Sequence, residues 1–175
     1  MAAFAATPPS GFVANHHNGR VRPLLLLDVD GVVCPLGDAA PDQVPIASTH
    51  VSLSHHRLLP GWLAELAKVF ELVWATTWEH DANELLAPLL GLPDLPVIQF
   101  AGTVVGPGET VKLPAIRRFV DDRAFAWVDD RLGVDATAWG AHRLAPTLLR
   151  DIDPASGLTR CDIDGLLAFA TNPQR

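Results

Sequence analysis

The sequence has few cysteines and no long hydrophobic run, and each shortage excludes a class of protein. Its two cysteines, Cys34 and Cys161, lie far apart without a CxxC pattern, so we expect a reduced, cytoplasmic protein rather than a disulfide-stabilised one. The longest aliphatic run, residues 24–27, is far too short to cross a bilayer. The first residues lack a charged leader before an apolar stretch, so we expect neither a signal peptide nor a membrane partner.

Positive charge is also scarce. The chain has 13 Lys and Arg residues against 20 Asp and Glu residues, a formal net charge of −7, and no basic run. Phosphate neutralisation supplies most of the affinity for extended nucleic acid, so such a partner is not expected, although recognition of a single terminal phosphate stays open. With 175 residues, 49% of them apolar and 19% charged, the chain has the composition of one soluble globular domain.

The order of the predicted elements indicates an α/β fold. Residues 1–20 show no periodicity and are expected to form a flexible lead-in, which leaves 21–175 as a single domain. Residues 31–60 are rich in Pro and Gly and are predicted to be mainly loop, with a small hairpin or flap at 47–56. Strands are predicted at 21–30, 71–77, 95–100, 124–130 and 146–152. Helices are predicted at 60–70, 81–91, 112–120, 135–143 and 162–170.

Strands that alternate with helices predict a doubly wound, Rossmann-like sheet, mostly parallel and five-stranded, with helices on both faces. Ligands bind such sheets beyond the carboxyl ends of the strands. Polar residues stand at the ends of three predicted strands and at the start of one helix. They are Asp28, Asp30, Thr76, Thr77, Lys112, Asp129 and Asp130.

The acidic residues among them predict a cation site. Asp28 and Asp30 are two residues apart and face the same side of a regular strand, and Gly31 lets the chain turn away directly after them. Asp129 and Asp130 approach from another strand. Such a cluster of carboxylates repels itself, and a hard cation with oxygen ligands relieves the repulsion. Mg²⁺ fits because it takes one or two carboxylates, waters and a substrate phosphate oxygen.

Each of these residues also has an ordinary structural explanation. An Asp pair after a strand is often a solvated turn, and Lys112 could be an exposed residue at a helix start. Thr76 could have no role beyond satisfying the hydrogen bonds at a strand end. Trp78 either lines the mouth of the site or packs against the core. His80, in the sequence WEHD, is expected in a solvated loop or helix start rather than as a metal ligand.

The four motifs in order resemble those of the haloacid dehalogenase-like (HAD) superfamily of phosphohydrolases. LLLLDVDGVV at 24–33 matches its first motif, Thr76 its second, Lys112 its basic third, and the pair at 129–130 its acidic fourth. More narrowly, LVWATTWEHDAN and VKLPAIRRF with AFAWVDD resemble the HAD domain of Swiss Army Knife RNA-repair proteins over most of 24–170.

This resemblance implies a phosphatase mechanism. Asp28 would attack phosphorus and form an aspartyl-phosphate, and Asp30 would protonate the leaving oxygen and then activate water. Thr76, with Thr77 as the near alternative, would hydrogen-bond a phosphoryl oxygen. Lys112 would pair with the phosphoryl group and the nucleophile.

The resemblance also implies how magnesium would be held. Asp28 and Asp130 would supply carboxylate ligands, and the backbone carbonyl of Asp30 would supply a third. Asp129 is the first alternative to Asp130 as the acidic ligand.

Chain length leaves no room for a large cap over the site. Only 46 positions separate Asp30 from Thr76, and 34 residues lie between Thr77 and Lys112. Within the superfamily, capless members suit large substrates, so we expect a nucleic-acid end or a phosphoprotein, presented by a partner protein. Two alternatives stay open. One is a phosphatase of nucleotides or metabolites closed by the flap at 34–59 or by an oligomer. The other is a non-catalytic binding module.

Overall fold

The computed structural model describes residues 16–17, 20–38, 40–46, 53–100, 102–103, 105–106 and 108–172. Most of the expected lead-in at 1–20 lies outside these residues. Within it, β1 (His16–His17) pairs antiparallel with β2 (Arg20–Val21). Across the described residues, every helix is too short or too polar to span a bilayer.

A four-stranded parallel sheet forms the centre of the molecule, and it confirms the predicted mostly parallel α/β fold. Its order is β6 (Glu71–Trp74), β3 (Leu24–Leu27), β7 (Phe125–Asp129) and β8 (Thr147–Asp151). The β3 and β7 strands lie in the middle and are buried along their whole length. Continuous aliphatic and aromatic runs are what a strand covered on both faces requires.

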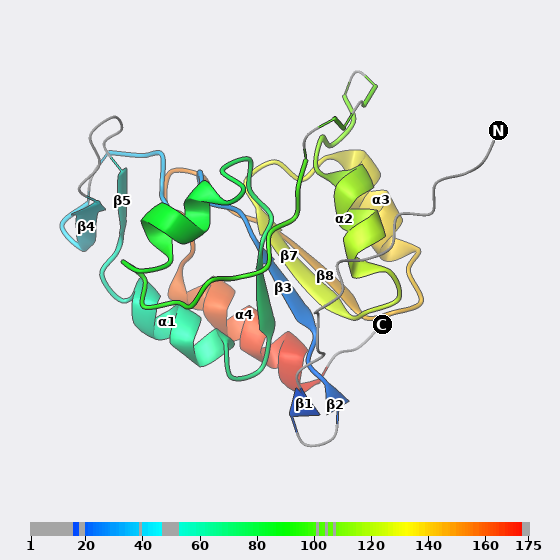
Figure 1. The fold of residues 1–175 in the computed structure, drawn as a ribbon, viewed down its shortest axis with the longest axis horizontal. Helices are drawn as coiled ribbons and strands as arrows, with labels where there is room; N and C mark the ends of the chain where they lie inside the picture. The colour runs from blue at the N-terminus through cyan, green and yellow to red at the C-terminus, as the bar shows by residue number, and fades with distance from the viewer. Residues whose placement is uncertain are drawn as a thin grey trace.

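Helices cover both faces of this sheet, as predicted. On one face lie α1 (Leu59–Leu66) and α4 (Arg160–Thr171), and on the other lie α2 (Leu113–Val120) and α3 (Val134–Ala141) (Figure 1). The two pairs separate clearly in Figure 1, with α1 and α4 on the lower left and α2 and α3 on the upper right.

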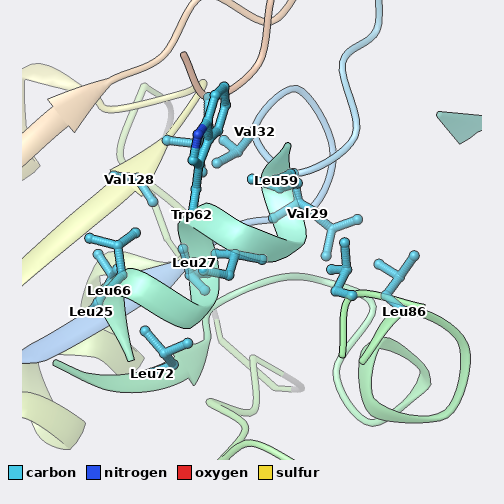
Figure 2. Close-up of a cluster of buried hydrophobic side chains, with 14 of the residues drawn as sticks. Leu25, Leu27, Val29, Val32, Leu59, Trp62, Leu66, Leu72, Leu86 and Val128 are labelled. Atoms are coloured by element: carbon cyan, nitrogen blue, oxygen red, sulfur yellow. The ribbon is translucent and has the colours of Figure 1, made fainter. Parts of the chain in front are cut away.

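Alternate residues of β3 divide the core into two layers. Leu25 and Leu27 belong to the cluster that includes Leu66 of α1, and Figure 2 shows these side chains together. Leu24 and Leu26 belong to the cluster on the α2 and α3 face. Because successive side chains of a strand point to opposite faces, the face of any residue that continues β3 can be read from its position.

The predicted strand at 95–100 is reduced to a single bridge, so the sheet has four strands rather than five. Val97 pairs with Trp74, through Trp74 N to the Pro96 carbonyl at 2.8 Å and Ile98 N to the Trp74 carbonyl at 2.9 Å. Pro96 has no N–H to donate, and the Leu95 N–H instead donates to the Asn83 side chain at 2.9 Å. A proline confined to the sheet edge accounts for the missing ladder.

The segment predicted as a helix at 81–91 forms a π-helical turn at Ala82–Leu86, and the side chain of Asp81 does not cap it. Ala87 N donates to the Ala82 carbonyl at 3.0 Å, and Leu92 N to the Ala87 carbonyl at 2.8 Å. Both bonds span five residues. Pro88 lacks the N–H that a regular α-helix would use at this point, which accounts for the wider turn.

The predicted flap is a two-stranded antiparallel hairpin of β4 (Gln43–Ile46) and β5 (Leu53–His56). Its second strand lies in the predicted segment, but its first strand lies just before it, and residues 47–52 fall outside the described part. The hairpin lies at the far left of Figure 1, beside α1. Between β3 and α1, the described residues hold no cap larger than this hairpin.

Candidate active site

The register of β3 and β7 brings two predicted carboxylates together. Leu27 is paired with Val128, so Asp28 and Asp129 follow on adjacent strands, and Asp28 N donates to the Val128 carbonyl at 3.3 Å. Asp28 alternates with Leu27 and Asp129 with Val128, so both carboxylates face the side of the sheet that α2 and α3 cover.

The side chain of Lys112 contacts both of these carboxylates. It directly precedes α2, which packs on the same face of the sheet through Leu113 and Ile116. Its Nζ lies 2.7 Å from Asp28 Oδ2 and 2.7 Å from Asp129 Oδ2. The Lys112 side chain is only 12% exposed, so one ammonium group is shared between two buried carboxylates.

A second contact fixes the segment that carries Lys112. Thr110 donates to the Asp135 carboxylate through its backbone N–H at 2.9 Å and through its hydroxyl at 2.6 Å. Gly133 N in turn donates to Thr110 Oγ1 at 3.1 Å. These bonds join the start of α2 to the start of α3, so the position of Lys112 depends on both helices.

Asp129 is well supplied with hydrogen-bond donors from the protein. Besides Lys112, its Oδ2 accepts a bond from Trp127 Nε1 at 3.1 Å, and its Oδ1 accepts one from Arg131 N at 2.9 Å. Asp130 has a weaker contact, with Arg131 Nε 3.6 Å from its Oδ2. The two neighbouring acids are therefore in different situations, one engaged at both oxygens and the other available.

Gly31 makes room for Asp130. Its φ of +72° is one that L side chains rarely adopt. A Cβ at this position would lie 2.8 Å from Asp130 Oδ2 and 2.9 Å from Asp130 Cβ. The glycine after the DVD sequence thus serves two purposes, because it allows the sharp turn and lets the side chain of Asp130, directly after β7, approach the loop after β3.

Asp30 also lines the cavity, and its carboxylate accepts a hydrogen bond from a tryptophan. Trp78 Nε1 donates to Asp30 Oδ2 at 3.0 Å, and Trp78 N donates to Thr76 Oγ1 at 3.3 Å. Trp78 thereby connects residues of the first and second motifs.

The two threonines differ in access. Thr76 is fully buried, whereas Thr77 is exposed and lines a cavity of about 370 Å³. Six of the seven predicted residues line this cavity, all except Thr76. They are Asp28, Asp30, Thr77, Lys112, Asp129 and Asp130.

The electrostatics of the cavity fit a cation. The pKa of Asp28 is raised to about 6, because burial, the largest effect, and the charge of Asp129 together outweigh the opposing charge of Lys112. Burial and then the charge of Asp129 also raise the pKa of Asp130. Oxygen atoms of Asp28, Asp129 and Asp130 all lie within 4.8 Å of one another. An all-oxygen donor set on groups that resist ionising together suits a hard divalent ion such as Mg²⁺.

Several residues of the site were not predicted. Arg131, Glu109 and Val111 also line the cavity. The contact of Trp127 could have been inferred, because it stands two residues before Asp129 on the same face of a strand. The bond from Trp78 to Asp30 spans 48 residues, and no local sequence signal indicates it.

Comparison with models of known protein families gives a match over most of the chain. The family model described as "HAD domain in Swiss Army Knife RNA repair proteins" matches residues 24–163. The matched range begins at the first residue of β3, contains all four strands of the sheet and ends within α4. No curated protein matches the chain.

Proposed function

Because the chain belongs to the family of HAD domains found in Swiss Army Knife RNA repair proteins, we propose that it is a Mg²⁺-dependent phosphatase that hydrolyses phosphate monoesters. The observation that carries this proposal is the contact of Lys112 Nζ with both Asp28 and Asp129 at 2.7 Å, beside a third carboxylate from the same strand end. A buried nucleophile paired with a fixed cation is the arrangement that phosphoryl transfer needs.

In the first step, a carboxylate oxygen of Asp28 attacks phosphorus. The bond from phosphorus to the leaving oxygen breaks, its electron pair stays on that oxygen, and the carboxyl group of Asp30 supplies the proton. Lys112 contacts the Asp28 carboxylate and lies where it can neutralise negative charge on the phosphoryl group. The product of this step is an aspartyl-phosphate and a free alcohol.

In the second step, water attacks the phosphorus of the aspartyl-phosphate. Asp30, now a carboxylate, accepts a proton from this water, and the bond from phosphorus to the Asp28 oxygen breaks. Inorganic phosphate leaves, Asp28 is again a carboxylate and Asp30 again holds a proton, so the cycle closes with one water consumed.

Magnesium would be held by Asp28 and Asp130, together with the backbone carbonyl of Asp30. Asp130 is favoured over Asp129 because both oxygens of Asp129 already accept bonds from Lys112, Trp127 and the backbone. When bound, the ion would neutralise charge on the carboxylates and on the phosphoryl oxygens.

For contact with phosphate, Thr77 is favoured over Thr76. The hydroxyl of Thr76 is buried and accepts a bond from Trp78 N, whereas Thr77 is exposed in the cavity. Lys112 is the second phosphate-binding residue in this proposal.

The substrate we propose is a large one, a nucleic-acid end or a phosphoprotein, because the described insert after β3 is only the β4–β5 hairpin and leaves the cavity without a lid domain. The alternative is a nucleotide or metabolite, which is supported by a cavity volume of about 370 Å³, within the usual range for small-molecule sites.

Hydrolysis of p-nitrophenyl phosphate with and without Mg²⁺ tests the activity. We expect Mg²⁺-dependent release by the wild type and none by Asp28→Asn. Asp94→Asn is a matched control, because Asp94 is exposed and lies outside the cavity lining. Equal release by wild type and Asp28→Asn, or no Mg²⁺-dependent release at all, would contradict the proposal and leave a non-catalytic module.

A substrate panel then separates the two substrate classes. Oligonucleotides with 5′- or 3′-phosphates and phosphopeptides represent the large class, and mononucleotides represent the small one. A kcat/KM for mononucleotides equal to or above that for every macromolecular substrate would exclude the large class.

A further inference from the structure

We propose that Trp78 is a positioning residue for proton transfer, in that its indole N–H holds the Asp30 carboxyl group in the orientation that the leaving oxygen requires. This inference rests on the proposed phosphatase activity and adds to it a residue that belongs to none of the four motifs.

The geometry of the contact is that of a strong hydrogen bond. Trp78 Nε1 lies 3.0 Å from Asp30 Oδ2, within the range of well-formed N–H···O bonds. Within the described part of the chain, Trp78 is the one donor that binds the Asp30 carboxylate. The backbone around Asp30 is fixed separately, by Gly31 N to the Cys34 carbonyl and Cys34 N to the Val29 carbonyl, both at 2.8 Å. The indole therefore sets the orientation of the Asp30 side chain, whereas the backbone bonds set the conformation of the loop.

Trp78 is itself held on several sides. Its ring packs against the hydrophobic core on the α1 and α4 face, and its backbone N–H binds Thr76 Oγ1. The next residue, Glu79, has a φ of +47°, which is uncommon for a residue with a side chain. The Glu79 carboxylate accepts a bond from Phe100 N at 3.0 Å. A conformation of this kind persists only where its surroundings enforce it, so the turn that presents Trp78 is rigid.

The chemistry of the indole determines which Asp30 oxygen can carry the proton. An indole N–H donates and cannot accept, so Oδ2, which accepts this bond, is the poorer site for the proton. A proton carried by Asp30 then sits on Oδ1, the oxygen left free to meet the substrate. Without the indole, the carboxyl group could rotate and offer the proton in the wrong direction.

This role makes a prediction that depends on the leaving group. An alkoxide must be protonated as it leaves, whereas p-nitrophenolate is stable without a proton. The ratio kcat/KM reports steps up to release of the alcohol and excludes the later hydrolysis of the aspartyl-phosphate. Removing the indole N–H should therefore lower kcat/KM for alkyl phosphates much more than for p-nitrophenyl phosphate.

The experiment compares wild type, Trp78→Phe and Trp74→Phe with Mg²⁺ on p-nitrophenyl phosphate and on the best alkyl phosphate of the panel. Trp74 is a matched control, because its indole N–H also binds a side-chain oxygen, Asn83 Oδ1 at 2.9 Å, outside the site. For Trp78→Phe we expect a loss of about 10- to 100-fold on the alkyl phosphate, part of the usual general-acid contribution. We expect less than about threefold loss on p-nitrophenyl phosphate, and for Trp74→Phe an unchanged ratio between the two substrates.

A double mutant tests whether Trp78 acts through Asp30. Asp30→Asn should show the same selective loss, and adding Trp78→Phe to it should not change the ratio further. A Trp78→Phe variant that loses activity equally on both substrates, loses none, or fails to fold would overturn the positioning role while leaving the phosphatase proposal intact. A wild type inactive on every phosphate would overturn both.

Discussion

Replacement of Asp28 by Asn should abolish turnover and yet stabilise the metal-free protein at pH 8. In the cluster, two buried carboxylates share the single ammonium group of Lys112, and Asp130 lies beside them. An amide at position 28 removes one negative charge and leaves Lys112 paired with Asp129. The proposed nucleophile is thus held at a cost in stability, as is common for active sites.

The magnitude follows from the pKa of Asp28. Its ordinary value of 3.8 is raised to about 6 in the folded protein, by burial first, against the attraction of Lys112. Because each pKa unit corresponds to about 1.4 kcal/mol, the ionised carboxylate lowers the free energy of unfolding by up to about 3 kcal/mol above pH 6. A raised carboxyl pKa means that stability is lost as the pH rises from 3.8 through 6. The advantage of Asp28→Asn should therefore be full at pH 8 and vanish towards pH 4.

Urea unfolding in EDTA, at pH 4, 6 and 8, measures this effect. We expect Asp28→Asn to be about 1–3 kcal/mol more stable than wild type at pH 8, whereas the exposed control Asp94→Asn should differ by less than about 0.5 kcal/mol. Added Mg²⁺ should stabilise the wild type more than the variant. An Asp28→Asn variant that is less stable than wild type in EDTA at pH 8 would refute the reasoning.

Three further predictions follow from other contacts. Gly31→Ala should lower the free energy of unfolding by about 1–3 kcal/mol, because position 31 has a positive φ and the added methyl group would displace Asp130. Calorimetry should show weaker Mg²⁺ binding by this variant. Wild-type values for both the stability and the Mg²⁺ affinity would contradict the prediction. Lys112→Gln should lower kcat/KM by about 10²–10³-fold, and a loss below about tenfold would remove Lys112 from the mechanism. Asp162 caps the start of α4, because its Oδ2 accepts bonds from the backbone N–H of Thr159 at 2.9 Å and from the Thr159 hydroxyl at 2.6 Å. Asp162→Asn should therefore cost about 1–2 kcal/mol at pH 7, measured by urea unfolding. Burial opposes ionisation of Asp162, but bonds from Thr159 and the nearby Arg150 lower its pKa. Because the ionised carboxylate makes these contacts, the cost of the substitution should shrink as the pH falls below about 4. An equal cost at pH 3 and pH 7 would contradict this stabilising role of the Asp162 carboxylate.

The parts of the fold that the sequence predicted are those where a local pattern is enough. The runs that form β3 and β7 are buried on both faces, and only a strand in the middle of a covered sheet calls for such runs. The segment at 95–100 looks equally strand-like, yet Pro96 and the bond from Leu95 to Asn83 limit it to one bridge. That competition depends on a partner twelve residues away, which periodicity does not report.

The candidate site also has parts that the sequence predicted and parts that it did not. Strand ends of a parallel sheet meet at one edge, so the order of elements predicted that Asp28 and Asp129 lie close together. The pairing of Lys112 with Asp28 was implied by the resemblance to the HAD superfamily. The choice between Thr76 and Thr77 did not, because it depends on which side chain the turn after β6 exposes. The difference between Asp129 and Asp130 depends on donors from Trp127 and Arg131, whose directions only the folded chain defines.

Asp28 and Asp129 directly follow paired residues of β3 and β7, and this alignment limits where the chain tolerates insertions. Leu27 stands beside Val128, and each acid is the next residue along. One residue added inside β3 would turn Asp28 towards α1 and α4, on the far side of the sheet from the lysine, although every motif would still be present. A chain that has these motifs but a different number of residues between the start of the strand and its acidic residue is therefore expected to lack this chemistry.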